Sequence, residues 1–371
     1  MNFKTEERFF EVDVLRGAAI FIMIVVDAPP ADIYEILQHA QWEGLTIADL
    51  AFPAFVFAMG MSAAISTSRR GTSLKKVISR TITLFLLGLI LNEVGYIFAY
   101  IFMADFTAEQ FYSSAVEHLR VFGILQRLAL TYLLGMAIVT FIQTDKEIFC
   151  AAFVLLIASS LGFHVYAAEN PFDEVNNIST AVDLFLPGAN HIYTTTGDPE
   201  GLYGTIASTA SMLFGFLAGR ILIDNSFLRD KIYFMGLFGA VFLICGEVWS
   251  LFDIVSKKLW TAPFVLFNAG GAMLFMAVLM QLFSYKPCVK KFFQPLAALG
   301  KNPLLMFMAS NITVIFLITV NVWSTAFELL QSILGGFMSV EMNVLIFVLI
   351  WAALWTVTAM LLDKAGVIIK I

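Results

Sequence analysis

Long apolar stretches alternate with short polar segments along the whole chain. Several of them exceed the roughly 18 apolar residues that mark a membrane-spanning helix. The pattern predicts ten spans, near residues 14–30, 45–67, 77–99, 120–142, 148–167, 202–223, 232–252, 259–283, 297–320 and 342–362. We therefore expect an all-α, polytopic membrane protein with a single domain over residues 1–371.

Four further segments add detail to this pattern. Residues 323–338 (WSTAFELLQSILGGFM) are apolar, but they are few and are interrupted by two glycines. They predict an interfacial or re-entrant helix, with an eleventh span as the alternative. The connections 100–119 and 168–201 are too long for tight turns and long enough to cover a site. The first span follows a segment without a small-residue cleavage site, so we expect it to be uncleaved.

Composition agrees with a membrane protein. Of the 371 residues 60% are hydrophobic and 13% are charged, whereas a soluble domain has about 25% charged residues. Cys150, Cys245 and Cys288 lie in or beside predicted helices and form no CxxC motif, which argues against disulfides and a thiolate metal site. No P-loop, GxSxG, HExxH or GxGxxG motif occurs. We expect no metal and no nucleic-acid partner.

Basic residues predict the orientation. If the N-terminus is cytoplasmic, 18 of the 22 Lys and Arg residues fall on the cytoplasmic side, as the positive-inside rule requires. The exceptions are Arg120, Arg127, Lys257 and Lys258. Both termini are therefore predicted to be cytoplasmic.

The histidines and most loop acids then fall on the outer side. The histidines are His39, His118, His164 and His191, and the acids are Asp32, Glu35, Glu43, Asp105, Glu109, Glu117, Glu169, Asp173, Glu174, Asp183, Asp198 and Glu200. The acids either complement the positive-inside bias or form a vestibule that attracts a cationic substrate such as an amino sugar.

The segment from His39 to Gly60, HAQWEGLTIADLAFPAFVFAMG, passes from a polar loop into an apolar helix that carries Asp49. A charge at membrane depth costs about 2.5–3.5 kcal/mol, so it is usually kept for a purpose. Pro53 cannot donate to the Asp49 carbonyl, which loosens the helix there. If the loop folds back at Gly44, Asp49 can orient the His39 imidazole as a general base. A hydrogen-bonding interfacial histidine is the alternative.

Three other charged residues lie within or beside apolar segments. Asp27 precedes two prolines at the end of the first span, where it either satisfies freed amides or faces the same cavity as Asp49. Arg120 and Arg127 are seven residues apart, so they share one face of a helix. They form internal salt bridges, or they bind an anionic group or polarise a reacting carbonyl.

The cytoplasmic side also carries candidate binding residues. Lys301 and Asn302 begin the ninth span in GKNPLLMF. Together with Arg80 and the RRGTSLKK loop they form a surface able to hold phosphates, although topology signalling explains the same loop residues. Gly215 and Gly219 match a small-xxx-small packing pattern, which indicates a structural role.

Several segments together resemble the heparan-α-glucosaminide N-acetyltransferase family of membrane acetyltransferases. They are DVLRGAAIFIMIVV, HAQWEGLTIADLAFPAFVFAMGMS, RVFGILQRLALTYLLG, DLFLPGANHIYTTTGDPEGLYGTIASTASMLFGFLAGRIL and ALGKNPLLMF. The likeness extends in order from about Val12 to Ile371. Animal members of the family have Asn at the position of Asp27, an N-terminal non-cytoplasmic domain and one additional span. The chain therefore resembles a compact bacterial relative of the inner membrane.

This resemblance implies transfer of acetyl from cytoplasmic acetyl-CoA, a co-substrate, to a glucosamine amine across the membrane. By position, His39 resembles the family's catalytic histidine and Asp49 the acid of the same motif, and we place Asp27 with them. Candidates for cofactor binding are Arg80, Arg120, Arg127, Lys301 and Asn302. Candidates for sugar binding are Trp42, His191 and Tyr193, with Tyr34 as a further stacking residue.

Alternatives remain open at this stage. His39 acts either as a general base or as an acetyl carrier, and the acceptor is a scavenged glucosaminide, a cell-wall sugar or a surface polysaccharide. A proton-coupled transporter or flippase, or a glycan-binding relative without catalysis, is a different class of function. We expect a homodimer by analogy with the family.

Overall fold

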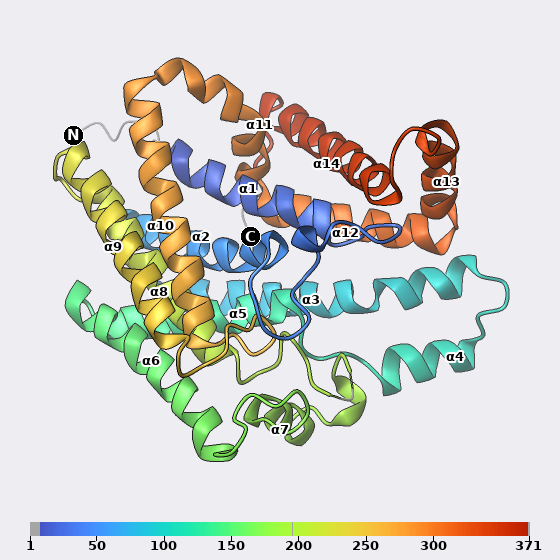
Figure 1. Ribbon diagram of the computed structural model, residues 1–371, viewed down its shortest axis with the longest axis horizontal. Helices are drawn as coiled ribbons and strands as arrows, with labels where there is room; N and C mark the ends of the chain where they lie inside the picture. The colour runs from blue at the N-terminus through green and yellow to red at the C-terminus, as the bar shows by residue number, and fades with distance from the viewer. Residues whose placement is uncertain (1–7, 195, 370–371) are drawn as a thin grey trace.

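The computed structural model describes residues 8–194 and 196–369, and the chain folds there into helices and loops without an extended strand (Figure 1). The α-helices are α1 (Phe10–Val26), α2 (Ile47–Arg70), α3 (Leu74–Phe102), α4 (Ala108–Tyr112), α5 (Ile124–Phe141), α6 (Asp145–Tyr166), α7 (Ile178–Phe185), α8 (Thr205–Ile223), α9 (Leu228–Trp249), α10 (Ala262–Tyr285), α11 (Lys290–Lys301), α12 (Pro303–Thr319), α13 (Val322–Leu334) and α14 (Val340–Lys364). The expected all-α architecture is confirmed for these residues.

Each predicted span corresponds to a helix or to a pair of helices. In the described part of the chain, eight helices are long and apolar enough to cross a bilayer: α2, α3, α5, α6, α8, α9, α10 and α14. The segment from Pro287 to Thr319 is a ninth candidate, but it bends by 77° where α11 meets α12. Pro303 at the start of α12 explains the break, because it cannot donate a helical hydrogen bond. The tenth expected span is α1, whose 17 residues make it shorter than these.

The segment expected to be interfacial or re-entrant forms α13 and ends before Gly335. Its 13 residues extend about 20 Å, which is less than the roughly 30 Å of a bilayer core. Its length therefore favours the interfacial or re-entrant interpretation over an eleventh span.

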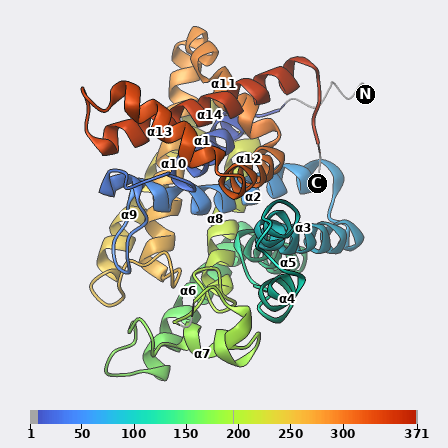
Figure 2. The ribbon, with the colours of Figure 1, turned by 90° about the vertical axis from the view of Figure 1, so that its right-hand side faces the viewer.

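Helices α1, α2 and α8 form the centre of the bundle. The C-terminal helices α11, α13 and α14 lie on one side of it, and α6 and α7 lie on the opposite side (Figures 1 and 2). The packing role expected for Gly215 and Gly219 is confirmed. A Cβ on Gly215 would lie 2.0 Å from the Phe57 carbonyl oxygen, and one on Gly219 would lie 2.7 Å from the Met61 carbonyl oxygen. Only glycine allows α2 and α8 to approach this closely.

Successive long helices run in alternating directions, so the loops that connect them lie at two ends of the bundle. The histidine end carries the connections 27–46, 103–123, 167–204 and 250–261, and all four histidines lie in or beside them. The arginine end carries the start of α1, the end of α2 and the α11–α12 junction. These two ends are the two places where polar chemistry can be organised.

Candidate functional site

His39 and Asp49 meet at the histidine end. The Nδ1 atom of His39 lies 2.8 Å from Oδ1 of Asp49, and Gly44 at φ +120° allows the intervening loop to fold back. A carboxylate can only accept, so Nδ1 carries the proton and Nε2 keeps a lone pair. The His39 side chain is 43% exposed, whereas that of Asp49 is fully buried. The contact therefore presents an oriented imidazole to a polar, accessible region.

The second carboxylate oxygen of Asp49 fixes the loop before α2. Its Oδ2 atom accepts hydrogen bonds from the backbone amides of Ala40 (3.1 Å) and Thr46 (3.2 Å) and from the Thr46 hydroxyl (3.0 Å). Asp49 lies in the first turn of α2, where amides lack helical partners. This capping role explains why a buried charge is tolerated. It also locks the carboxylate that orients His39.

Lys257 is the third side chain at this point. Its Nζ atom lies 3.1 Å from Nε2 and 3.0 Å from Nδ1 of His39, and 3.8 Å from Oδ1 of Asp49. Because Nδ1 already donates to Asp49, Nε2 is the ring atom that can accept from the ammonium. Burial lowers the pKa of Lys257, while the charges of Glu200, Asp49 and Asp27 act in the opposite direction.

Two loops are tied together to form this geometry. The Gly44 amide donates to the Val255 carbonyl at 2.7 Å, which joins the His39 loop to the Lys257 loop. The Trp42 indole donates to the Phe172 carbonyl at 2.9 Å. The buried Trp260 has φ +55°, a left-handed conformation that is strained for a bulky residue.

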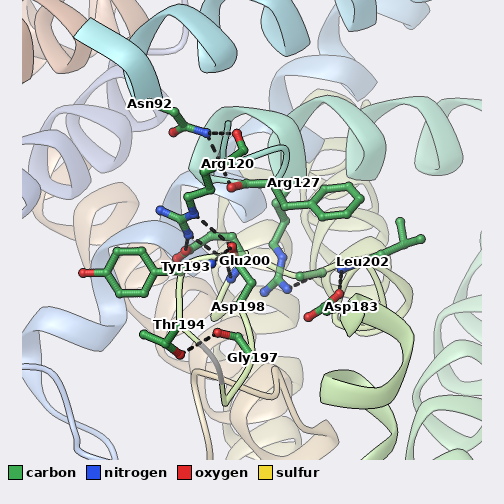
Figure 3. A network of polar contacts seen from close by, with 12 residues as sticks. Asn92, Arg120, Arg127, Asp183, Tyr193, Thr194, Gly197, Asp198, Glu200 and Leu202 are labelled. Atoms are coloured by element: carbon green, nitrogen blue, oxygen red, sulfur yellow. Dashed lines mark hydrogen bonds and ion pairs between the residues drawn. The ribbon is translucent and has the colours of Figure 1, made fainter. Parts of the chain in front are cut away.

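Arg120 and Arg127 lie at the same end but are engaged elsewhere (Figure 3). Arg120 binds Asp198 through two hydrogen bonds of 2.9 and 2.6 Å and Glu200 through one of 2.7 Å. Its guanidinium also lies 4.5 Å from the centre of the Tyr193 ring. The internal salt bridge that was one interpretation of Arg120 is therefore present.

Arg127 is fully buried. Its Nη2 atom donates to the Gly201 carbonyl at 2.6 Å, and its guanidinium lies over the Trp260 ring at 5.1 Å. Its Nε and Nη1 atoms have no hydrogen-bond partner among the described residues. A Cβ on Gly204 would lie 2.5 Å from Nη2, so a larger residue there would displace the guanidinium.

Asp183 lies beside the same turn and is also fully buried. Its Oδ1 atom accepts from the Leu202 amide at 2.9 Å (Figure 3). Burial raises the pKa of Asp183 to about 6, against the opposing effect of this hydrogen bond. The turn 201–204 thus runs between a buried cation and a carboxyl group.

A cavity of about 150 Å³ opens beside this network, and its lining includes Trp42, Glu174, Tyr193, Asp198 and Lys258. Trp42 and Tyr193 thus line one cavity, and their binding of a sugar stays a prediction. His191 is not among its lining residues, and its Nδ1 contacts the Leu119 carbonyl at 2.8 Å. Tyr34 is 37% exposed and is also outside this lining.

Asp27 follows the end of α1 and faces the same region. It lies within electrostatic range of Lys257, His39 and Glu200 and interacts with the Asn311 side chain. The charge of Asp27 is therefore close enough to act on His39 and Lys257, and its place in a cavity shared with Asp49 stays a prediction.

The other predicted cofactor residues lie at the arginine end. None of the contacts described below joins them to the cluster around His39. Lys301 binds Asp363 at 2.6 and 2.8 Å. Asn302 donates to the Val367 carbonyl and accepts from the Ile369 amide, so it fastens the C-terminal segment. The Arg80 guanidinium lies 4.6 Å from the centre of the Tyr132 ring.

Two cavities open at the arginine end. One, of about 180 Å³, is lined by Arg8, Arg16, Arg69 and Arg70 together with Asp13 and two serines. The other, of about 630 Å³, lies between the ends of α2, α5 and α8 and includes Arg220 in its lining. Neither shares a lining residue with the cavity at the histidine end.

Two features of the histidine end were missed by sequence reasoning. Lys257 was identified only as an exception to the positive-inside rule, which is the signal that could have found it. A second histidine–carboxylate pair joins His164 Nε2 to Asp253 Oδ1 at 2.9 Å, and Asp253 also accepts from the Trp249 indole at 3.1 Å. This pair anchors the start of the loop that carries Lys257.

Comparison with known proteins relates this arrangement to a family. The family model for the catalytic region of heparan-alpha-glucosaminide N-acetyltransferase matches residues 8–231, more than half of the chain. The human and mouse proteins of that name are each 24% identical to this chain, over 82% and 81% of its length. The match covers 53% of either relative, so the chain spans about half the length of the curated relatives it matches.

The matched region contains His39, Asp49, Arg120 and Asp198, although Lys257 lies beyond it. The chain belongs to the heparan-alpha-glucosaminide N-acetyltransferase family of multi-pass membrane acetyltransferases.

Proposed function

We propose that this protein transfers acetyl from cytoplasmic acetyl-CoA to an amine or hydroxyl of an amino sugar or glycan on the outer side of the membrane. The observation that carries this proposal is the pair formed by His39 and Asp49 within the region that matches the family. The histidine end is then the outer end, and the arginine end and both termini are cytoplasmic.

His39 acts as the general base. Its Nδ1 proton is held by Asp49, so the Nε2 lone pair, which Lys257 contacts at 3.1 Å, is the position that takes the proton of the attacking acceptor group. Asp49 stabilises the imidazolium that forms and does not itself become protonated. An acetyl-histidine intermediate, in which Nε2 itself attacks the thioester, uses the same oriented ring and is the competing mechanism.

Charge at the arginine end supports binding of the donor there. The 180 Å³ cavity lined by Arg8, Arg16, Arg69 and Arg70 matches the phosphates of coenzyme A in charge, because guanidinium groups bind phosphates through paired hydrogen bonds. The cavity suits a phosphate group rather than the whole coenzyme. Lys301 and Asn302, which bind the C-terminal segment, have a supporting role in this proposal.

The pantetheine arm must then pass between the two ends of the bundle. Polar side chains are buried along α5 and α8 between these ends: Thr131 and Ser208 hydrogen-bond to each other at 2.6 Å, and the Gln126 amide has no partner in the described chain. These groups can exchange hydrogen bonds with the amides of the arm. The arm would carry the acetyl group toward His39.

The acceptor is proposed to bind in the cavity lined by Trp42 and Tyr193. Aromatic rings provide the apolar faces on which sugar rings stack, and Glu174 and Asp198 place carboxylates beside them. Such carboxylates attract an amino sugar. In size, about 150 Å³, the cavity fits one sugar unit.

The test is release of free thiol from acetyl-CoA by the purified protein in detergent, with a panel of amino sugars and glycans as acceptors. We expect acceptor-dependent thiol release that His39→Ala abolishes. His118→Ala is the matched control, because His118 is exposed and contacts only the Ser113 carbonyl among the polar partners that the structure gives it. A transporter or flippase would release no thiol, and unchanged turnover in His39→Ala would remove His39 from the reaction.

A further inference from the structure

We propose that the ammonium group of Lys257 binds the thioester oxygen of the donor and stabilises the negative charge that develops on it during transfer. This inference rests on the proposed function of His39. It assigns to Lys257 a role for which Arg120 and Arg127 were the candidates from the sequence.

The position of Lys257 beside His39 supports this role. An acyl-transfer site needs a base and an oxyanion donor that both lie about 3 Å from the reacting group. The Nζ atom lies 3.1 Å from Nε2 of His39, so the attacking amine can meet Nε2 while the oxygen of the carbonyl that it attacks meets Nζ. A developing oxyanion is also a stronger acceptor for an ammonium than a neutral ring nitrogen.

The two arginines at the histidine end have other contacts, and the described chain shows none between either of them and His39. Arg120 is bound by Asp198 and Glu200. Arg127 donates to a backbone carbonyl and lies over Trp260.

Lys258 is the neighbour of Lys257 in sequence, but its Nζ atom lies 5.7 Å from the centre of the Trp42 ring. Of these four basic residues, Lys257 is the one for which the described chain shows a contact with His39.

The Lys257 loop is held in place from both sides. Asp253 is fixed by His164 and Trp249, and the Val255 carbonyl accepts from the Gly44 amide. A donor held before the reaction need not reorganise as charge develops, and this preorganisation is the main source of oxyanion stabilisation. The anchors therefore support a catalytic position for the lysine rather than a mobile surface position.

Lys257 stays protonated throughout the transfer step, and His39 carries the one proton that moves. The acceptor amine attacks the carbonyl carbon, a C–N bond forms, and the carbonyl electron pair moves to the oxygen that Lys257 holds. His39 Nε2 takes the proton from the amine. The intermediate then collapses, the C–S bond breaks, and the imidazolium returns that proton to the thiolate, which gives the acetylated amine and coenzyme A.

Only the ammonium form of Lys257 can perform this role. Burial lowers its pKa from the ordinary value, so activity should be lost on the alkaline side below the ordinary lysine range near pH 10. The charged or titratable groups that face it are His39, Asp49, Asp27, Glu200 and Arg127. The lysine can be distinguished from them by substitution.

The experiment measures kcat and KM for acetyl-CoA and for the acceptor, and the pH profile of kcat/KM, in Lys257→Met, Lys257→Arg and Lys258→Met. Removal of an oxyanion donor typically lowers kcat by about 10²–10³-fold, and we expect this loss in K257M with KM for acetyl-CoA little changed. K257R should recover part of kcat and move the alkaline limb upward, because a guanidinium does not titrate there. K258M removes the same charge one residue away and should affect KM for the acceptor without moving the alkaline limb.

A kcat of K257M within about threefold of the wild type would overturn the inference, as would an equal loss of kcat in K258M. If K257M does not fold, the pH profile of kcat/KM of K257R is the test. An alkaline limb at the wild-type position in K257R would overturn the proposal. His39→Ala distinguishes failure of the Lys257 role from failure of the proposed function. Inactive H39A with fully active K257M removes only the role of Lys257, whereas active H39A removes the proposed function of His39.

Discussion

Arg120 and Asp198 form a two-pronged ion pair that joins the segment before α5 to the segment before α8 (Figure 3). The carboxylate side chain is fully buried, and the guanidinium is 23% exposed. The pair therefore holds the long 167–204 connection against the bundle, beside the cavity lined by Trp42 and Tyr193.

Replacement of Arg120 by Met should destabilise the protein strongly. It leaves the buried charge of Asp198 without its partner, and such a loss typically costs about 3–5 kcal/mol. The expected result is a lower thermal unfolding midpoint in detergent and faster proteolysis within residues 186–201. Arg120→Lys keeps the charge but lacks the two-pronged geometry. Its thermal unfolding midpoint should therefore lie between those of the wild type and R120M. Wild-type stability in R120M would show that the pair does not hold the connection.

The spans and the histidine–carboxylate contact were accessible from sequence, whereas the surroundings of the contact were not. Long apolar runs form helices, so each predicted span falls on a helix or on a helix pair, and eight helices of the described chain, or nine with the bent pair, are long and apolar enough to cross a bilayer. The turn at Gly44 and the spacing of His39 and Asp49 are local, and they predict the contact without knowledge of the remaining fold.

Lys257 comes to His39 from 218 residues away. Its position depends on the left-handed backbone of Trp260 and on the pair formed by His164 and Asp253, and neither has a local sequence signal. The sequence did mark Lys257 as a basic residue on the unexpected side. It could not decide which of four such residues reaches the imidazole, because that depends on the paths of two distant loops.

Asp49→Asn should abolish most activity without unfolding the protein. The amide oxygen can still accept from Ala40 and Thr46, but the amide nitrogen would donate to His39 Nδ1 and move the ring proton to Nε2. The equivalent exchange in serine proteases lowers kcat by about 10⁴-fold, and we expect a loss of about 10³–10⁴-fold here. Thiol release measures it, and circular dichroism with thermal unfolding measures the fold.

Asp49→Ala is the contrasting variant. It removes all four acceptor contacts of the carboxylate, so it should lose both activity and stability. Full activity in D49N would mean that the tautomer of His39 does not matter for the reaction.

Gly215→Ala should destabilise the packing of α2 against α8. The added methyl group would lie 2.0 Å from the Phe57 carbonyl oxygen, and backbone atoms cannot rotate away as a side chain can. Overpacking of this kind costs about 1–3 kcal/mol or more. Gly236→Ala in α9 is the matched control, because a Cβ there meets no atom within 4 Å. Equal unfolding midpoints for the two variants would contradict this account of the helix contact.

Asp183 should make stability depend on pH. Its pKa is raised to about 6 in the folded protein, compared with about 3.9 in an unfolded chain. Between these values the folded state holds a proton that the unfolded state has lost, so stability falls as pH rises from about 4 to 6 and is level above that. A shift of about two pKa units corresponds to about 3 kcal/mol.

Asp183→Asn removes this dependence, because an amide does not titrate and its oxygen can still accept from the Leu202 amide. Relative to the wild type, D183N should therefore be more stable at pH 8 than it is at pH 4, as measured by thermal unfolding. Asp173→Asn is the control of opposite sign. Hydrogen bonds from the Asn176 and Val175 amides lower the pKa of Asp173, so its contribution is present near neutral pH and is lost in acid. D173N should therefore be less stable than the wild type at pH 8 and approach the stability of the wild type below the lowered pKa. If the stability of D183N changed with pH in parallel with that of the wild type, Asp183 would not be the titrating group.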